Sequence, residues 1–230
     1  VLTLVLLRRS LGAAVRGERL TWQRFGTEHL ESYRNMRSLL PGTVFVWHTL
    51  MYTSLVTFIP LFGSPEALGM LLIWMPLLSI LGTLSAGFVI RVLPRPALVA
   101  SAGYAMVAVL TIAVWLAISG DVDIVAIALV LMFFSGLIQG AAFSLIPALS
   151  TDPAINARAN GTITQLGNLG NLLGSPLFAA ALAGTMFGTF GTVALLVVVL
   201  CVGGLVMCAV TLRWMRRHGV RPTPQTAHTP

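Results

Sequence analysis

The chain has 230 residues, of which 57% are hydrophobic and 9% are charged, and its net charge of +7 comes from fourteen arginines without a single lysine. Soluble domains contain about 25% charged residues, so this composition excludes an ordinary soluble protein, which could not bury so much apolar surface. The charge does not indicate a nucleic-acid partner either, because the arginines flank apolar runs instead of covering one polar face. We therefore expect a membrane protein.

Six apolar runs each approach or exceed the about 20 residues that a helix needs to cross the hydrocarbon core of a bilayer. They are residues 41–63, 68–90, 97–118, 124–149, 159–184 and 192–212. Arginines occur before the first run, in the second and fourth connections and after the sixth run, whereas the other connections contain none. Cytoplasmic loops retain positive charge during insertion, so the pattern predicts six transmembrane helices with both termini in the cytoplasm. The exclusive use of arginine suggests a GC-rich genome and hence a bacterial inner membrane.

The segments before and after these runs differ in character. Residues 1–7 are apolar but too short to span, and we interpret them as the end of a preceding transmembrane helix, which would make the chain a fragment. An unusual start with a short interfacial patch is the alternative. Residues 8–40 are predicted to be a polar cytoplasmic linker, which Pro41 ends by opening the next helix. Residues 41–212 form the six-helix bundle, and residues 213–230 are expected to be a disordered cytoplasmic tail, because they are polar and rich in proline.

The six runs differ from one another in a pattern that repeats after three. The first, second, fourth and fifth contain proline and polar side chains, whereas the third and sixth contain no proline and few polar side chains. Proline kinks a helix and frees a backbone group that neighbours must satisfy, so we expect those four helices to surround an interior and the other two to face lipid. Two successive triplets run in opposite directions, which predicts an all-α polytopic fold with an inverted three-plus-three repeat. The prolines are Pro60, Pro76, Pro147 and Pro176.

The fifth run carries the strongest cluster of polar side chains. At 100° per residue, five of them fall within about 80° of one another: Asn160, Thr164, Asn168, Asn171 and Ser175. A neighbouring face consists of Gly167, Gly170 and Gly174. Glycines allow helices to approach closely, and amides form hydrogen bonds across helices or to a ligand. Helix packing and substrate binding are both open interpretations of this face.

The fourth and first runs add further candidates. Ser135, Gln139 and Phe143 share one face of the fourth run, and His48 and Tyr52 lie one turn apart on the first. Ionisable groups inside a membrane are costly and usually functional, and histidine titrates near physiological pH, so His48 is a candidate for proton coupling. A neutral, hydrogen-bonded histidine near the interface is the alternative. The predicted substrate cavity is formed by His48, Tyr52, Ser135, Gln139, Thr164, Asn168 and Asn171.

Two segments resemble a known family. Residues 136–182 look like the tenth and eleventh helices of a major facilitator superfamily transporter. The second connection is similar to the cytoplasmic loop motif of that family, here Gly82, Gly87, Arg91 and Arg95, but lacks its acidic residue. The resemblance covers residues 41–212, and it implies that the chain is the carboxy-terminal half of a twelve-helix transporter. Its partner would be the missing amino-terminal six-helix half.

The predicted function follows from the fold and from these candidates. The sequence contains no cysteine–histidine cluster for a metal, no phosphate-binding glycine loop with lysine and no paired carboxylates, so we expect neither an enzyme nor a cofactor. We predict secondary active transport of a small solute by alternating access, with membrane lipid around the protein. The alternative is a non-transporting six-helix membrane subunit or a channel component, although a channel normally shows charged rings or a repeated filter sequence.

Overall fold

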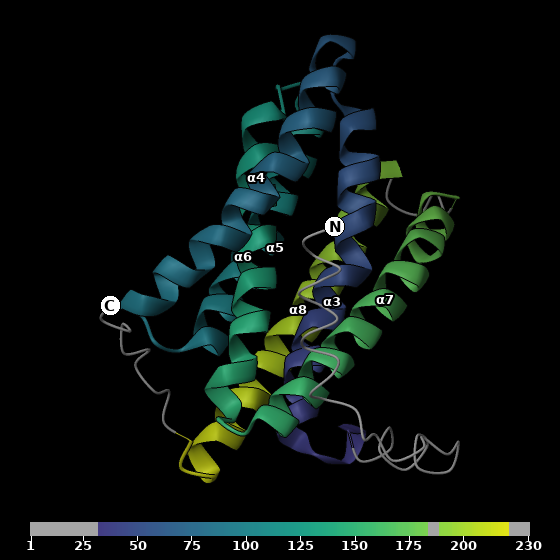
Figure 1. Cartoon of the computed structure of the whole chain (residues 1–230). Helices are drawn as coiled ribbons and strands as arrows, with labels where there is room; N and C mark the ends of the chain where they lie inside the picture. Colours follow the sequence, from purple (N-terminus) through teal and green to yellow (C-terminus); the bar gives the residue numbers. More distant parts are fainter. Residues whose placement is uncertain (1–31, 184–188, 221–230) are drawn as a thin grey trace, which may run out of the picture.

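The computed structural model describes residues 32–183 and 189–220, and every element of this part of the chain is helical (Figure 1). The elements are α3 (Met36–Phe58), the 3-10 helix η1 (Ile59–Phe62), α4 (Pro65–Val92), α5 (Pro96–Ser119), α6 (Val125–Leu149), α7 (Pro153–Ala183) and α8 (Thr189–Arg217). Six helices of this part are long and apolar enough to cross a membrane. This number confirms the six membrane-spanning helices predicted from the apolar runs. The expectations for residues 1–7, for most of the linker and for the end of the tail lie outside the described residues.

The first long helix begins earlier than the sequence pattern predicted. The side-chain oxygen of Asn35 accepts a hydrogen bond from the backbone N–H of Arg37 at 3.0 Å, so Asn35 caps α3 and the helix begins at Met36. Asparagine is among the strongest N-cap residues. The prediction that Pro41 opens this helix is therefore wrong, because Pro41 lies inside it.

The other ends of the bundle also extend beyond the apolar runs. α7 begins at Pro153, where the carboxylate of Asp152 accepts a hydrogen bond from the N–H of Ala154 at 2.8 Å. α8 continues to Arg217, past residue 212, where we placed the end of the bundle. Arginines in a last turn are favourable because the helix dipole is negative there. Charged residues mark the membrane boundary of such a helix without ending its hydrogen-bonded turns.

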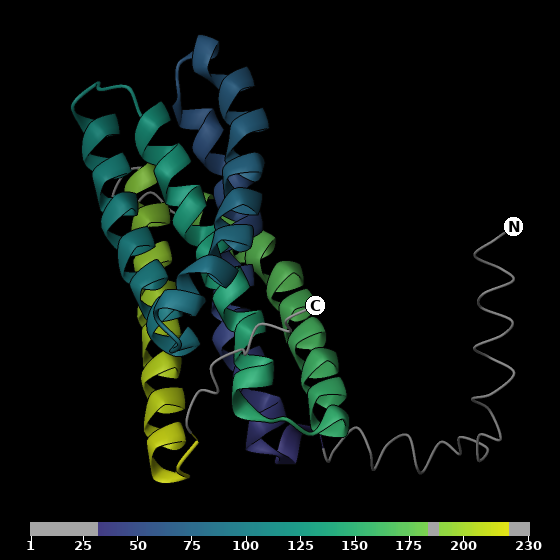
Figure 2. The same cartoon turned by 60° about the vertical axis from the view of Figure 1, so that its left-hand side comes forward.

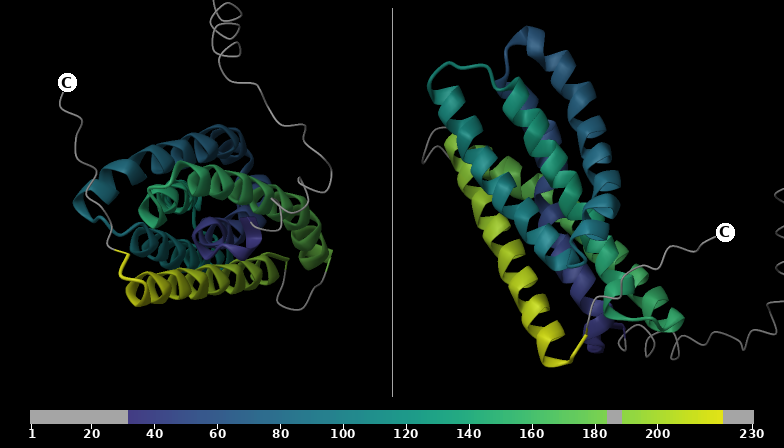
Figure 3. Two further views of the ribbon diagram at one scale, coloured as in Figure 1. Left: turned by 60° about the horizontal axis from the view of Figure 1, so that its bottom comes forward. Right: turned by 90° about the vertical axis from the view of Figure 1, so that its left-hand side faces the viewer.

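The bundle is built around α3 and α6. The two most extensive contacts are those of α3 with α7 and of α4 with α6, followed by those of α5 with α6 and with α8. α3 also contacts α8 and α6. Seen end-on, α4 and α8 lie on opposite sides of the molecule with α3 between them (Figure 3). A second side view shows α5 and α8 next to each other on one side and α7 on the other (Figure 2).

Glycines bring the two largest helix contacts to backbone distance. A Cβ atom on Gly136 of α6 would overlap the carbonyl of Ser79 on α4. In the same way, a Cβ atom on Gly174 of α7 would overlap the carbonyl of Leu50 on α3. The four-residue spacing of small residues on these helices therefore serves close packing, as such residues commonly do between membrane helices.

The third and sixth helices are less exposed than we expected. α5 buries Tyr104, whose hydroxyl donates a hydrogen bond to the backbone carbonyl of Val44 at 2.6 Å, and this ring packs against Gly204 of α8. The outer faces of α5 and α8 are apolar and exposed, for example at Leu116 and Val202. However, α4 and α7 expose still more of their surface. Which helices face lipid depends on what covers α4 and α7, so the assignment of α5 and α8 as the lipid-facing pair stays a prediction.

Candidate functional site

The predicted candidates on α3 and α6 meet at the centre of the bundle. His48 is 1% exposed, and its Nε2 atom lies 3.0 Å from the hydroxyl oxygen of Ser135 on α6. The imidazole stacks on Phe45 with ring centroids 5.6 Å apart and lies 5.3 Å from the ring of Tyr52. A serine hydroxyl can donate or accept, so this contact accommodates either neutral tautomer of the histidine. The Nδ1 atom is buried without a hydrogen-bond partner among the described residues.

The polar face of α7 is exposed along its length. Its five polar side chains are all exposed in this bundle: Asn160, Thr164, Asn168, Asn171 and Ser175. One of them bonds to the neighbouring helix, because Thr53 of α3 donates a hydrogen bond to Oδ1 of Asn171 at 3.1 Å. Thr164 instead donates to the backbone carbonyl of Asn160, at 2.8 Å. The helix is attached to α3 through its glycine face, and the amide face next to it stays open.

The structure brings only some of the predicted cavity residues together. Gln139 is half-buried on α6, and among the described residues no hydrogen bond joins it to the candidates on α7. Phe143, from the same face of α6, is 39% exposed and packs edge-on against Phe45 with ring centroids 5.3 Å apart. The candidates therefore form two groups, a buried one around His48 and Ser135 and an open one on α7.

One side of the open group was not predicted from the sequence. Thr53 holds Asn171, and Thr49 and Thr57 lie one turn before and after it on α3. Residues four apart share a helix face, so this row of threonines was a visible signal beside the more conspicuous His48 and Tyr52. A second missed contact is the hydrogen bond from the hydroxyl of Tyr33 to the side-chain oxygen of Gln165 on α7.

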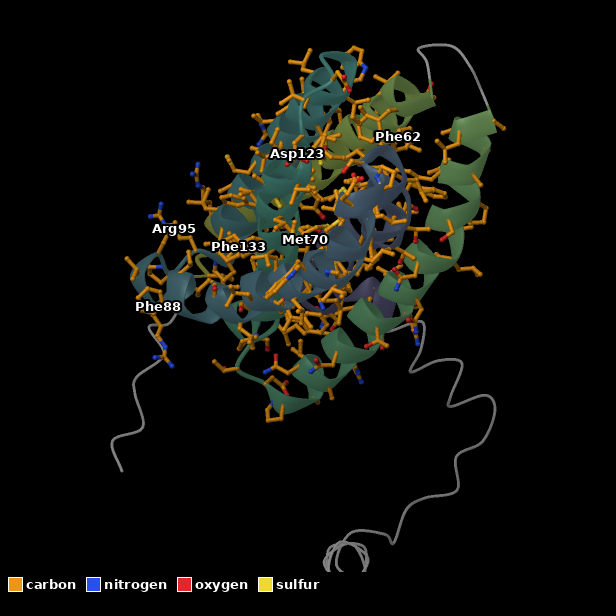
Figure 4. The ribbon with its side chains drawn as sticks, turned by 90° about the horizontal axis from the view of Figure 1, so that it is seen from above. Phe62, Met70, Phe88, Arg95, Asp123 and Phe133 are labelled. Carbon is orange, nitrogen blue, oxygen red and sulfur yellow. The ribbon has the colours of Figure 1, made fainter. Side chains whose placement is uncertain are left out.

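The residues of the predicted loop motif do not form one site. Gly82 is buried in the middle of α4 against α6, whereas Gly87 has no atom near the place of a Cβ and is exposed. Arg91 lies in the last turn of α4, and Arg95 precedes α5; both are exposed. In Figure 4, which views the molecule from above, Arg95 lies with Phe88 at the left edge, apart from Asp123. The first glycine therefore serves helix packing, and the two arginines lie at helix ends on the surface of the bundle.

The open face combines two properties that oppose each other in a lipid environment. α7 is the least hydrophobic of the six long helices in the described part, and it is also the least covered: 22% of its most apolar segment is buried, against 56% for α6. Amide side chains at membrane depth are costly when they face hydrocarbon. The face of α7 that carries Asn168 and Asn171 therefore requires water or another polypeptide beside it.

Two cavities in the described part lie away from this face. One, of about 420 Å³, is formed by the start of α5 and the end of α8. The other, of about 340 Å³, has an almost entirely apolar lining and lies between α7 and α8, among residues such as Leu177 and Leu196. Neither of these two cavities is lined by the predicted substrate residues.

Comparisons of the chain with known protein families, with curated proteins and with solved structures found no match. The class of the protein therefore rests on its own residues and geometry. In the described part of the chain, six long apolar helices indicate a multi-pass helical membrane protein.

Proposed function

We propose that this chain is one half of a secondary active transporter of the major facilitator superfamily, which moves a small solute across a membrane by alternating access. The observation that carries the proposal is the exposed amide face of α7, which lipid cannot cover at low cost. In a transporter of this kind, two bundles enclose an aqueous site near the middle of the membrane. The open faces of α7 and α4 are where the second bundle and the solute would lie.

An inverted repeat of α3–α5 and α6–α8 belongs to the same proposal. His48 and Ser135 are 87 residues apart, and so are Pro60, in η1 directly after α3, and Pro147, near the end of α6. His48 and Ser135 therefore occupy equivalent places in the two triplets, and they touch each other. Contact between equivalent residues is what a two-fold axis between α3 and α6 would produce.

Contacts of the remaining helices support the same equivalence. A two-fold axis that relates α3–α5 to α6–α8 exchanges α3 with α6 and α4 with α7. It therefore relates the contact of α3 with α7 to the contact of α6 with α4, and these are the two most extensive contacts of the bundle. Gly170 of α7 lies against the carbonyl of Val46, and Gly82 of α4 lies against the carbonyl of Phe133, the residue that corresponds to Val46.

The geometry divides the candidates by role within this proposal. Thr164, Asn168 and Asn171, which are exposed on α7, would form the solute wall, and the half-buried Gln139 of α6 would contribute to it. These side chains are uncharged, so they would bind a solute by hydrogen bonds. His48 contacts Ser135 in this conformation. Proton coupling through His48 would require transport to separate that pair and to hydrate the ring.

The charge distribution supports a bacterial inner membrane topology with both termini in the cytoplasm. Arg91, Arg95 and Arg158 lie in or next to the connections of one end, whereas Glu66 and Asp121 lie at the connections of the other. Cytoplasmic loops carry the arginine excess. The alternative function, a non-transporting membrane subunit, shares this topology but predicts that another chain seals the polar face of α7.

Cysteine labelling tests the proposal directly. The background is C201A/C208A, in which Asn168→Cys tests the polar face and Val202→Cys is a matched control, since Val202 is exposed on the apolar side of α8. Thiol reagents act on the thiolate, which forms only where water reaches. We expect a small impermeant reagent to modify Asn168→Cys and to leave Val202→Cys unmodified in intact membranes. An unreactive Asn168→Cys would contradict an aqueous solute path and favour the sealed subunit.

A further inference from the structure

The cavity between α5 and α8 has a composition unlike that of the polar face. It measures about 420 Å³, and α7 contributes no residue to it. Leu98, Leu212 and Met215 give it apolar walls, and Arg95 and Arg216 add two cationic groups. An apolar wall beside two guanidinium groups is complementary to a phospholipid, which has apolar acyl chains and an anionic phosphate.

The two arginines lie at different kinds of helix end, and only Arg95 lies where the helix dipole is positive. Arg95 is the N-cap residue of α5 and no side chain caps that helix, so the positive end of its dipole adds to the guanidinium charge. Arg216 lies in the last turn of α8. Both side chains are exposed and can turn toward a ligand in the cavity.

Acidic side chains near the cavity are scarce in the part of the chain that the structure describes. Among the acidic residues of the described part, Glu66, Asp121 and Asp123 belong to the connections at the opposite end of the bundle. Asp152 is at the same end, but its carboxylate accepts the N–H of Ala154 at the start of α7. Residues 221–230, which follow α8 in the sequence, contain no aspartate or glutamate. An anion from outside the chain therefore fits this place electrostatically.

We propose that this cavity binds an anionic phospholipid, with its phosphate between Arg95 and Arg216 and the upper part of an acyl chain along Leu98, Leu212 and Met215. Arginine binds phosphate oxygens with paired hydrogen bonds, and basic pockets between membrane helices recognise anionic head groups. The site lies on the side of the bundle away from the polar face of α7. Lipid binding at this site requires only that the protein is inserted in a membrane. The lipid proposal is therefore independent of whether the protein transports a solute.

The test is lipid binding by the purified 230-residue chain, measured by native mass spectrometry in titrations with phosphatidylglycerol and phosphatidylcholine. We expect tighter binding of phosphatidylglycerol. Each arginine near an anionic head group contributes a factor of roughly five in affinity, so R95Q/R216Q should bind phosphatidylglycerol about 30-fold more weakly. The matched control is R91Q/R217Q, which removes two exposed arginines of the same end that do not line the cavity. This control should retain most of the binding.

Three results would overturn the proposal. Equal loss in R95Q/R216Q and R91Q/R217Q would mean that surface charge attracts the lipid without a specific site. Equal affinity for the two lipids would exclude recognition of an anionic head group. Displacement of phosphatidylglycerol by inorganic phosphate at a similar concentration would identify a free anion site, in which the apolar wall has no part.

Discussion

Two glycines of one helix offer the sharpest test of how the bundle is held together. Gly82 and Gly87 both lie on α4, but their surroundings differ. A Cβ atom on Gly82 would overlap the carbonyl of Phe133 on α6 and would lie 3.1 Å from the backbone nitrogen of Leu137. At Gly87, no heavy atom lies within 4 Å of a Cβ. The same substitution, glycine to alanine, should therefore have opposite effects at the two positions.

The size of each effect follows from what the added methyl group meets. At Gly82 the obstacle is backbone, which cannot rotate away, so α4 and α6 must separate. Overpacking of this kind costs about 1–3 kcal/mol or more. At Gly87 the methyl group meets open space, and alanine in a helix is more stable than glycine by roughly 0.5–1 kcal/mol. We expect Gly82→Ala to destabilise the protein and Gly87→Ala to leave its stability unchanged or slightly higher.

Thermal unfolding in detergent can measure this difference with a dye that fluoresces on reaction with thiols. The chain suits the method because Cys201 and Cys208 are both fully buried and become reactive only on unfolding. A change of 1 kcal/mol shifts the melting temperature of a chain of this size by roughly 2–4 °C. Gly82→Ala should therefore melt about 2–12 °C lower. Equal melting temperatures for the two variants would refute the backbone contact between α4 and α6.

Three further predictions concern other contacts. In a double-mutant cycle of His48→Gln and Ser135→Ala, the coupling energy should be about 0.6 kcal/mol and at most about 1.7, the range of hydrogen bonds between membrane helices; additive effects would mean that the pair does not interact. Asn171→Leu should lower the stability of the protein by a similar amount because it removes the hydrogen bond from Thr53. Asn168→Leu on the same face should leave the stability unchanged, and the melting temperatures and purified yields of the two variants measure this difference. Cysteine at Ser64 should react with an impermeant reagent from outside the cell and cysteine at Thr151 only from inside, and the reverse labelling would invert the proposed topology.

The number of helices and their apolar segments could be predicted because hydrocarbon thickness sets a minimum length that the sequence displays directly. Helix ends could not be predicted as well. Asn35 and Asp152 cap α3 and α7 outside the apolar runs, and arginines continue α8 for another turn. Capping depends on a single side chain and its geometry, whereas hydropathy averages over many residues.

The candidate site divides in the same way. The polar and glycine faces of α7 followed from the 3.6-residue period, which fixes the directions of side chains on one helix. The contact between His48 and Ser135 did not follow, although both residues were candidates, because the period does not specify how two helices are rotated against each other. For the same reason, Thr53 was missed as the partner of Asn171.

The glycine contacts also affect how the bundle can deform. Where backbone lies on backbone, as at Gly136 and Gly174, no side chain stands between the helices to change rotamer during a sliding motion. We therefore expect α4 and α6 to move together as one rigid unit, and α3 and α7 to move together as another. The contacts of α7 with α8 and of α4 with α5 are much smaller. We expect bending of the molecule to occur mainly at these two small helix contacts. Amide hydrogens in the middle of α6 should exchange far more slowly than those at the ends of α4.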